Sequence, residues 1–299
     1  MELRAAAERA MTENLLPGPL VSTKWLAENL GERDLRILDC TTVQATSPEG
    51  GYVFEPGLKE WRAGHIPGAV FCDVLNELRD PDNPLPLMMP KPDAFARAME
   101  ALGVGEGTRV ILYDRGANVW AARVWWSLRV FGFDNAAILD GGWRKWTGEN
   151  RTVSTEASPR REARFQPRFR RRLLASKDEV LESVKNGGAA LVHSLSREEF
   201  KGEVTRMPRP GRISSSVNIP AAALLDPVTN TYLPLSDIKA RFERAGVFSA
   251  PRIITYCGGG VAACGNALAL TLIGREDVAV YDGSLAEWTA DPDAPMETG

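Results

Sequence analysis

The sequence predicts an α/β protein made of two similar halves, each a mainly parallel β-sheet with helices on both faces. Three observations favour this fold class. The chain repeats itself, short apolar runs alternate with longer helical segments in both copies, and 299 residues are more than one hydrophobic core usually needs.

The repeat is clearest in its longest segment. Residues 119–146 align without a gap to residues 261–288, with matches at Val119/Val261, Leu128/Leu270, Gly132/Gly274, Asp140/Asp282 and Trp146/Trp288. Upstream, RVILYD (109–114) aligns with RIITYC (252–257), and GHIPGAV (64–70) aligns with GRISSSV (211–217). Such a register indicates a tandem duplication.

Each copy alternates two kinds of segment. Strands are predicted for the short apolar runs at 35–39, 109–114, 135–140, 189–193, 252–257 and 278–282. Helices are predicted for the segments of helical period at 93–103, 119–132, 235–246 and 265–274. Strands that alternate with helices in this way are typical of a parallel sheet covered on both faces.

A polar segment separates the copies. Residues 147–172 contain Pro159 and Pro167, and their second part is rich in arginine, with Arg160, Arg161, Arg164, Arg168, Arg170, Arg171 and Arg172. We interpret this segment as a connector between an N-terminal domain (1–146) and a C-terminal domain (173–299). The arginines suit either an anionic partner or an exposed, acid-paired face, and the second interpretation is favoured.

Composition excludes several classes of function. The net charge of −3 gives no general basic surface for nucleic acid. No apolar run approaches the roughly 20 residues of a membrane span, and the N-terminal segment carries Glu2, Glu8 and Glu13, unlike a signal or transit peptide. The sequence therefore predicts a soluble, cytoplasmic protein that binds neither nucleic acid nor membrane.

Four cysteines are present, at positions 40, 72, 257 and 264. They form no C-x-x-C pair and there is no histidine cluster, so no metal site is predicted. Cys40 and Cys72 lie in or beside apolar runs, where a free cysteine is usually a small core residue. Cys264 is expected to pack about one turn inside a helix.

Cys257 differs from the other cysteines because three glycines follow it. It ends a predicted strand at the carboxyl edge of a parallel sheet, where α/β folds place ligands, so the thiol is expected to face a cleft. Gly258, Gly259 and Gly260 let successive N–H groups converge at a helix N-terminus, which favours a thiolate or another anion. The corresponding loop of the first copy begins with Asp114, is one residue longer and has one glycine, so its N–H groups are not expected to converge.

These motifs identify a family resemblance that covers about residues 20–295. GHIPGAVFCD, LDGGWRKW, YCGGGVAAC and VYDGSLAEW are similar to segments of tandem-domain rhodaneses, the thiosulfate and 3-mercaptopyruvate sulfurtransferases. The resemblance implies two tandem rhodanese-like domains, with an inactive first domain, since Asp114 stands where Cys257 stands in the repeat. It also implies a Cys257 persulfide that passes sulfur from either donor to cyanide or a thiol, thioredoxin included, with no cofactor.

The resemblance assigns the persulfide-binding loop and, less directly, substrate-binding residues. The loop is Gly258, Gly259, Gly260, Val261 and Ala262, and it resembles the neutral CGSGVT of mercaptopyruvate enzymes, although the serine and the threonine are replaced. Arg209 is the first candidate for donor binding, followed by Arg206, Arg212 and His65; the alternatives are solvent-exposed arginines and a structural histidine.

Three further positions depart from the family pattern. Leu195 and Glu199 occupy positions where an arginine is expected, and His193 replaces an acidic residue and is given no catalytic role.

Two other functions share features with this loop. A tyrosine-phosphatase loop also places a cysteine before a helix, but such loops end in a phosphate-clamping arginine, and CGGGVAAC has none. The other alternative is a degenerate rhodanese that acts as a binding or regulatory module. Retention of Cys257 with its glycines favours the enzyme.

Overall fold

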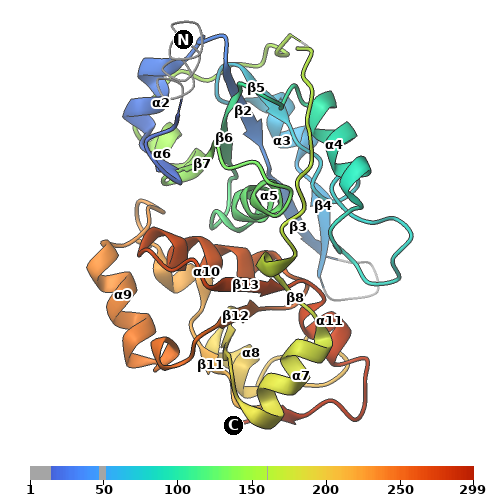
Figure 1. Ribbon diagram of the computed structural model, residues 1–299. Helices are drawn as coiled ribbons and strands as arrows, with labels where there is room; N and C mark the ends of the chain where they lie inside the picture. Colours follow the sequence, from blue (N-terminus) through green and yellow to red (C-terminus); the bar gives the residue numbers. More distant parts are fainter. Residues whose placement is uncertain (1–14, 47–51, 160) are drawn as a thin grey trace, which may run out of the picture.

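The computed structural model describes residues 15–46, 52–159 and 161–299 and contains two five-stranded sheets, one in each half of the chain (Figure 1). In the first sheet the order is β1-β7-β6-β2-β5, and every neighbouring pair is parallel. Its strands are β1 (Leu20–Val21), β2 (Leu35–Asp39), β5 (Ala69–Phe71), β6 (Arg109–Tyr113) and β7 (Ala136–Leu139).

The second sheet has the same topology, read from the equivalent edge as β8-β13-β12-β9-β11, again all parallel. Its strands are β8 (Leu174–Ala175), β9 (Ala190–His193), β11 (Val217–Asn218), β12 (Ile253–Tyr256) and β13 (Val278–Tyr281). The predicted fold class and the predicted duplication are therefore confirmed.

Helices cover both faces of each sheet, and one layer of helices is shared. The inner helices are α4 (Pro92–Ala101), α5 (Val119–Val130), α9 (Leu235–Arg244) and α10 (Val261–Leu272). The outer helices are α2 (Thr23–Asn29), α3 (Leu58–Ala63), α6 (Gly142–Gly148), α7 (Lys177–Asn186), α8 (Arg197–Lys201) and α11 (Ser284–Trp288). One core joins the inner faces of both sheets, and a separate smaller core lies behind each sheet.

The two halves meet at α5 and α10, which lie between the sheets (Figure 1). Both helices directly follow the loops that hold Asp114 and Cys257. Gly265 on α10 permits close packing, because a Cβ at this position would lie 3.3 Å from Ala221 Cβ and 3.7 Å from Val119 Cγ1. The loops of the two halves are therefore brought to one interface.

Shorter elements complete the fold and were not predicted. An antiparallel hairpin joins β3 (Thr42–Thr46) to β4 (Tyr52–Pro56), and β10 (Arg212–Ile213) pairs antiparallel with β14 (Met296–Glu297). Three 3-10 helices lie in the second half, η1 (Arg171–Leu173), η2 (Ala221–Leu224) and η3 (Val247–Ser249). Within the described ranges, no helix has the length and apolar character needed to cross a membrane.

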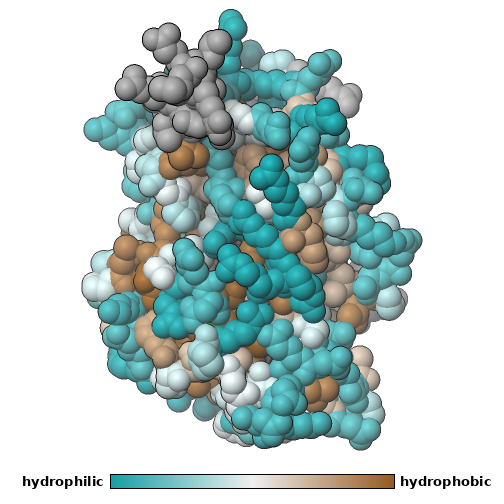
Figure 2. Space-filling model, viewed as in Figure 1, coloured by the Kyte–Doolittle hydropathy of each residue, from teal (hydrophilic) through white to brown (hydrophobic). Residues whose placement is uncertain are grey.

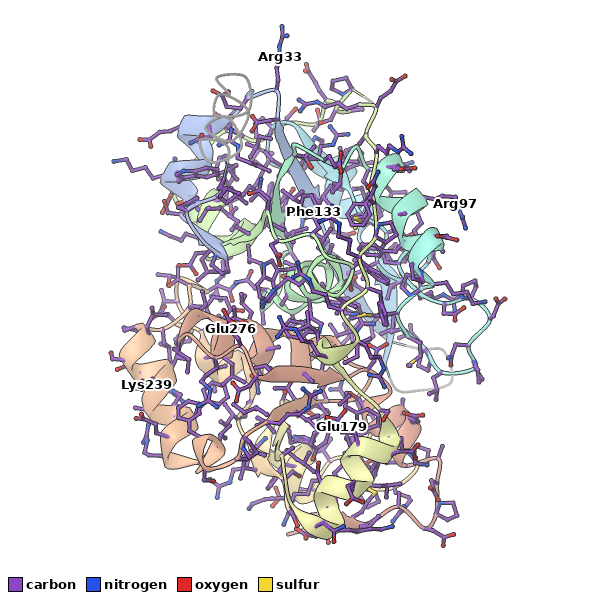
Figure 3. All side chains as sticks on the ribbon, in the orientation of Figure 1. Arg33, Arg97, Phe133, Glu179, Lys239 and Glu276 are labelled. Carbon is purple, nitrogen blue, oxygen red and sulfur yellow. The ribbon has the colours of Figure 1, made fainter. Side chains whose placement is uncertain are left out.

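The arginine-rich connector packs along the first half. The N–H groups of Arg168 and Arg170 donate to the carbonyls at the end of α5, each at 2.7 Å. Phe165 is buried in the inner core and contacts Phe133, which is labelled in Figure 3. Hydrophilic side chains cross the middle of the face shown in Figure 2.

One connector arginine is paired with an acidic residue, as the favoured interpretation expected, and another binds backbone carbonyls. Arg170 pairs with Asp134 at 2.5 Å, and Arg161 Nη1 donates to the carbonyls of Arg33 and Leu35 at 2.7 and 2.9 Å. Arg160 and the N-terminal residues 1–14 lie outside the described residues.

Candidate active site

Cys257 lies where the sequence places it, between the end of β12 and the start of α10. Its N–H donates to Ser284 Oγ at 3.1 Å. The carbonyls of Cys257 and Gly258 accept from the N–H groups of Leu285 and Ala286 at 3.0 and 2.9 Å. The start of α11 therefore holds the loop through three hydrogen bonds, one with the N–H of Cys257 and two with the carbonyls of Cys257 and Gly258. This role of Ser284 was not predicted from the sequence.

The N–H groups of the three glycines are not used by the protein. Among the described residues, no group accepts a hydrogen bond from the N–H of Gly258, Gly259 or Gly260. Only Gly260 requires glycine for its backbone, since its φ is +77° and a Cβ there would lie 2.8 Å from the carbonyl oxygen of Asp282. Gly258 and Gly259 lie outside the left-handed region.

The equivalent loop in the first half shows what such N–H groups do. The Asp114 carboxylate accepts from the N–H groups of Gly116 (2.8 Å) and Asn118 (3.1 Å) through Oδ1, and from Trp120 and Ala121 (both 3.0 Å) through Oδ2. The prediction that these groups do not converge was wrong. Convergence needs a left-handed residue at the helix N-cap, and Asn118 supplies it with φ of 58°.

The repeat alignment shows which backbone N–H groups of the second half correspond to those that bind Asp114. Asn118, Trp120 and Ala121 align with Gly260, Ala262 and Ala263. The helix start at Val119 matches that at Val261, and both N-caps have left-handed backbone. The Cys257 loop can therefore hold an anion with the same backbone groups, and Ala263 joins the predicted set.

The Cys257 side chain is more enclosed than the expected open cleft, with 2% of its surface exposed. Met207 Cε and Leu195 Cδ1 lie 3.1 and 4.0 Å from where a Cβ on Gly258 would stand. Leu87 Cδ1 lies 3.9 Å from the corresponding point on Gly259. Apolar side chains thus border the loop.

Cys264 packs inside α10, as predicted. It is fully buried, and its Sγ lies 3.1 Å from the carbonyl oxygen of Gly260. Burial raises the pKa of this thiol to about 12. Cys264 is therefore held as a neutral thiol next to the loop. Cys40 and Cys72 are also buried, in the core of the first half.

A buried ion pair connects the two halves behind the loop. Arg123 on α5 binds Asp282, which follows β13, and their side chains are 3% and 7% exposed. Burial lowers the pKa of the Arg123 guanidinium, but its interactions with Asp282 and Cys264 together outweigh this effect and the net shift of the pKa is upward. Arg123 also donates to the carbonyls of Leu87 and Gly260, the latter at 3.4 Å.

At the interface, the aspartate after the last inner strand of each half accepts a hydrogen bond from a segment of the other half. Asp282 Oδ2 accepts from Met89 N–H at 2.8 Å, and the aligned Asp140 accepts from Tyr232 N–H, also at 2.8 Å. The pairing of Arg123 with Asp282 was not predicted from the sequence. The Asp140/Asp282 match in the repeat was the one feature that singled out Asp282.

The predicted basic residues have other partners. Arg206 Nε lies 3.9 Å from Glu199, and Arg209 Nη1 donates to the carbonyls of Asp291 and Ala294 at 2.7 and 2.9 Å. Arg212 pairs with Glu297 at 3.2 Å and lies over the Phe200 ring. None of these contacts reaches the Cys257 loop, so donor binding by these arginines stays a prediction.

His65 is fully buried in the first half, away from these contacts. Its ring stacks on Trp61, and its nitrogens lie 2.8 and 3.0 Å from the carbonyl oxygens of Trp61 and Glu156. These contacts fit the structural alternative, and a role in donor binding stays a prediction.

Two residues that depart from the family pattern also have structural contacts. Glu199 forms a capping box with Ser196 at the start of α8. His193 is fully buried beside Tyr256 and Phe200. Burial and, less strongly, Arg212 lower the pKa of His193 to about 4, so it is neutral at pH 7. No cluster of three His, Cys, Asp or Glu suited to a metal ion occurs in the described part of the chain.

Comparison with known proteins places this site in a class. The family model described as "Rhodanese-like domain" matches residues 22–149 and 176–291. The chain belongs to the rhodanese family, with two copies of the domain in tandem.

Individual relatives span nearly the whole chain. The chain is 35% identical to thiosulfate sulfurtransferase from Bos taurus, and the match covers 93% of this chain and 94% of that protein. It is 34% identical to 3-mercaptopyruvate sulfurtransferase from Escherichia coli K12 (93% and 97%). The crystal structure of SseA from Escherichia coli, a 3-mercaptopyruvate sulfotransferase, matches with a TM-score of 0.79 and 31% identity over 89% of this chain and 98% of that one.

Proposed function

We propose that this chain is a sulfurtransferase that carries sulfane sulfur as a persulfide on Cys257. The observation that carries the proposal is the ring of backbone N–H groups. In the first half the ring binds the Asp114 carboxylate, and the aligned groups around Cys257 have no charged side chain to bind. A persulfide supplies the missing negative charge on its outer sulfur.

The reaction proceeds by double displacement. The Cys257 thiolate attacks the outer sulfur of thiosulfate, forming Cys–S–S⁻ and releasing sulfite. With 3-mercaptopyruvate, the attack breaks the carbon–sulfur bond, and the thiol proton passes to the carbon that becomes the methyl group of pyruvate. An acceptor then removes the outer sulfur, so that cyanide becomes thiocyanate or a thiol becomes a persulfide, and the Cys257 thiolate is restored.

The surrounding residues have distinct roles in this proposal. Gly258, Gly259, Gly260, Val261, Ala262 and Ala263 present N–H groups to the outer sulfur, and Ser284 holds the backbone of Cys257. Residues 173–299 form the catalytic domain, residues 1–146 form a non-catalytic domain, and residues 147–172 connect them. The proposal extends to a cytoplasmic location and to thioredoxin among the thiol acceptors.

For the donor, 3-mercaptopyruvate is expected to react at least as well as thiosulfate. Thiosulfate carries two negative charges, and the loop offers no side-chain cation to offset their desolvation. Arg209 is the proposed partner of the mercaptopyruvate carboxylate, with Arg206, Arg212 and His65 as further candidates. A preference for thiosulfate of tenfold or more, about 1.4 kcal/mol, would contradict this ranking.

The test is thiocyanate release from both donors with cyanide as acceptor. We expect turnover by the wild type and none by Cys257→Ser. Failure with every donor would instead support the alternative function, a rhodanese that serves as a binding or regulatory module.

A further inference from the structure

Three side chains form an apolar rim around the Cys257 loop: Leu87, Leu195 and Met207. A Cβ on Gly258 would meet Met207 Cε and Leu195 Cδ1, and one on Gly259 would meet Leu87 Cδ1. No other non-adjacent group lies within 4 Å of either point. All three rim residues are half-buried, so each keeps part of its surface accessible to solvent.

The rim is built from three separate segments that are each fixed by their own contacts. Leu87 comes from the first half, and Arg123 binds its carbonyl. Leu195 directly precedes the capping box of α8, and its carbonyl accepts from Asn218 Nδ2 at 2.9 Å. Met207 N–H donates to Thr205 Oγ1 at 3.1 Å. The methyl groups therefore stand at the loop as part of the fold.

The charged side chains near these segments are directed to protein partners. Arg206, next to Met207 in the chain, has its Nε 3.9 Å from the Glu199 carboxylate. Arg123 is neutralised by Asp282 behind the loop. A doubly charged donor that approaches the rim loses hydration against methyl groups, whereas an apolar group gains from contact with them.

This inference rests on the proposed persulfide chemistry and specifies its substrate class. We propose that the site prefers an organic sulfur donor whose sulfane sulfur is attached to an apolar group, and that Leu87, Leu195 and Met207 determine this preference. With an aryl thiosulfonate, the Cys257 thiolate attacks the terminal sulfur, the bond between that sulfur and the sulfonyl sulfur breaks, and the sulfinate leaves with the electron pair. Charge and atoms balance as Cys–S⁻ + R–SO₂–S⁻ → Cys–S–S⁻ + R–SO₂⁻.

Benzenethiosulfonate and methanethiosulfonate are suitable probes because they share charge and reacting atoms and differ in the apolar group. We expect kcat/KM with cyanide as acceptor to be at least about tenfold higher for the benzene compound, as one apolar group in a hydrophobic pocket gives about 10- to 200-fold. Leu195→Gln and Met207→Gln should each reduce this ratio by at least about fivefold, because a polar amide replaces methyl contacts. The control is Val204→Gln, an exposed apolar residue of the same segment outside the rim, which should leave the ratio unchanged.

Three outcomes are distinguishable by intact-mass detection of the persulfide together with the kinetics. Persulfide formation with equal use of the two thiosulfonates would overturn the inference and leave the proposed function standing. The inference would also be overturned, and the proposed function left standing, if the rim variants and Val204→Gln changed the ratio of the two kcat/KM values equally. Absence of a persulfide with thiosulfate, 3-mercaptopyruvate and both thiosulfonates would overturn the proposed function and this inference together.

Discussion

The Asp114 loop and the Cys257 loop share a backbone plan and differ in the side chain at their first position. Both follow the central strand of their sheet, β6 or β12, and both precede a helix at the interface between halves. In the first half, the anion is permanent, because the Asp114 carboxylate accepts four N–H groups. In the second half, a cysteine takes the place of the aspartate, so the backbone N–H groups can bind an anion that forms and disappears during the reaction, the proposed persulfide. The loops also differ by one residue in length and by two glycines, so the exchange of a carboxylate for a thiol is one of three differences between them.

The covers of the two loops differ as well. Over the Asp114 loop, Asn230 Nδ2 donates to the Gly116 carbonyl at 2.9 Å, and Asn118 Nδ2 donates to the Asn230 carbonyl at 3.1 Å. The Cys257 loop is bordered instead by the apolar rim. Asparagine hydrogen bonds therefore cover the first loop, whereas apolar side chains border the second loop.

The largest effect is expected at the position where the loops differ. Cys257→Ser should abolish persulfide formation, because a hydroxyl cannot be sulfurated by these donors, whereas Cys264→Ser should keep a substantial part of it. Intact mass after donor treatment checks both variants. Equal loss in Cys264→Ser would mean that two thiols take part in the chemistry.

The aligned aspartates at the interface should contribute unequally. Asp282→Asn leaves Arg123 buried without its counter-charge and should cost about 3 to 5 kcal/mol in the free energy of unfolding. Asp140→Asn keeps an acceptor for the Tyr232 N–H and should cost only about 1 kcal/mol. Urea unfolding of both variants measures the difference. Equal losses in the free energy of unfolding would show that the Arg123–Asp282 ion pair contributes no more to stability than the Asp140 hydrogen bond does.

Two glycines of the loop provide a matched pair. Gly260→Ala places a Cβ 2.8 Å from the Asp282 carbonyl oxygen in a left-handed conformation, which should lower kcat/KM about 100-fold, or about 2.7 kcal/mol. For Gly259→Ala the nearest non-adjacent atom is Leu87 Cδ1 at 3.9 Å, so activity should stay within about threefold. If both variants lose activity equally, glycine is required for a reason other than the backbone of Gly260.

The smallest effect is a pH dependence at His193, which aligns with Asp39 in the first half. Burial lowers the pKa of His193 to about 4 from an unfolded value of 6.5, so the unfolded state takes up a proton before the folded state does. The stability contributed by the neutral ring is present above pH 6.5 and is lost as the pH falls toward 4, by about 2 kcal/mol between pH 7 and 5. His193→Gln should lack this component in urea unfolding at the two pH values, whereas an identical pH dependence in both proteins would contradict the assignment.

Local patterns predicted the three inner strands of each sheet, the inner helices and the position of Cys257, because each depends on nearby residues and on the repeat. The short edge strands of both sheets were not predicted. The Asp114 loop was mispredicted because glycine content was taken as the condition for convergence, whereas the left-handed Asn118 meets it. The pairing of Arg123 with Asp282 and the apolar rim join residues from different segments of the chain, and no local pattern fixes such contacts. The contacts of Arg209 with residues 291 and 294 depend on loop packing in the same way.

The central claim is that the backbone N–H groups that hold a carboxylate in one half hold a persulfide in the other. A crystal structure of the protein after treatment with a sulfur donor tests this most directly. The account predicts an additional sulfur atom on Cys257 within hydrogen-bonding distance of the N–H groups of Gly260, Ala262 and Ala263, with the Asp114 carboxylate unchanged on its four donors. An added sulfur that points away from these groups, or that is found on Cys264, would contradict it.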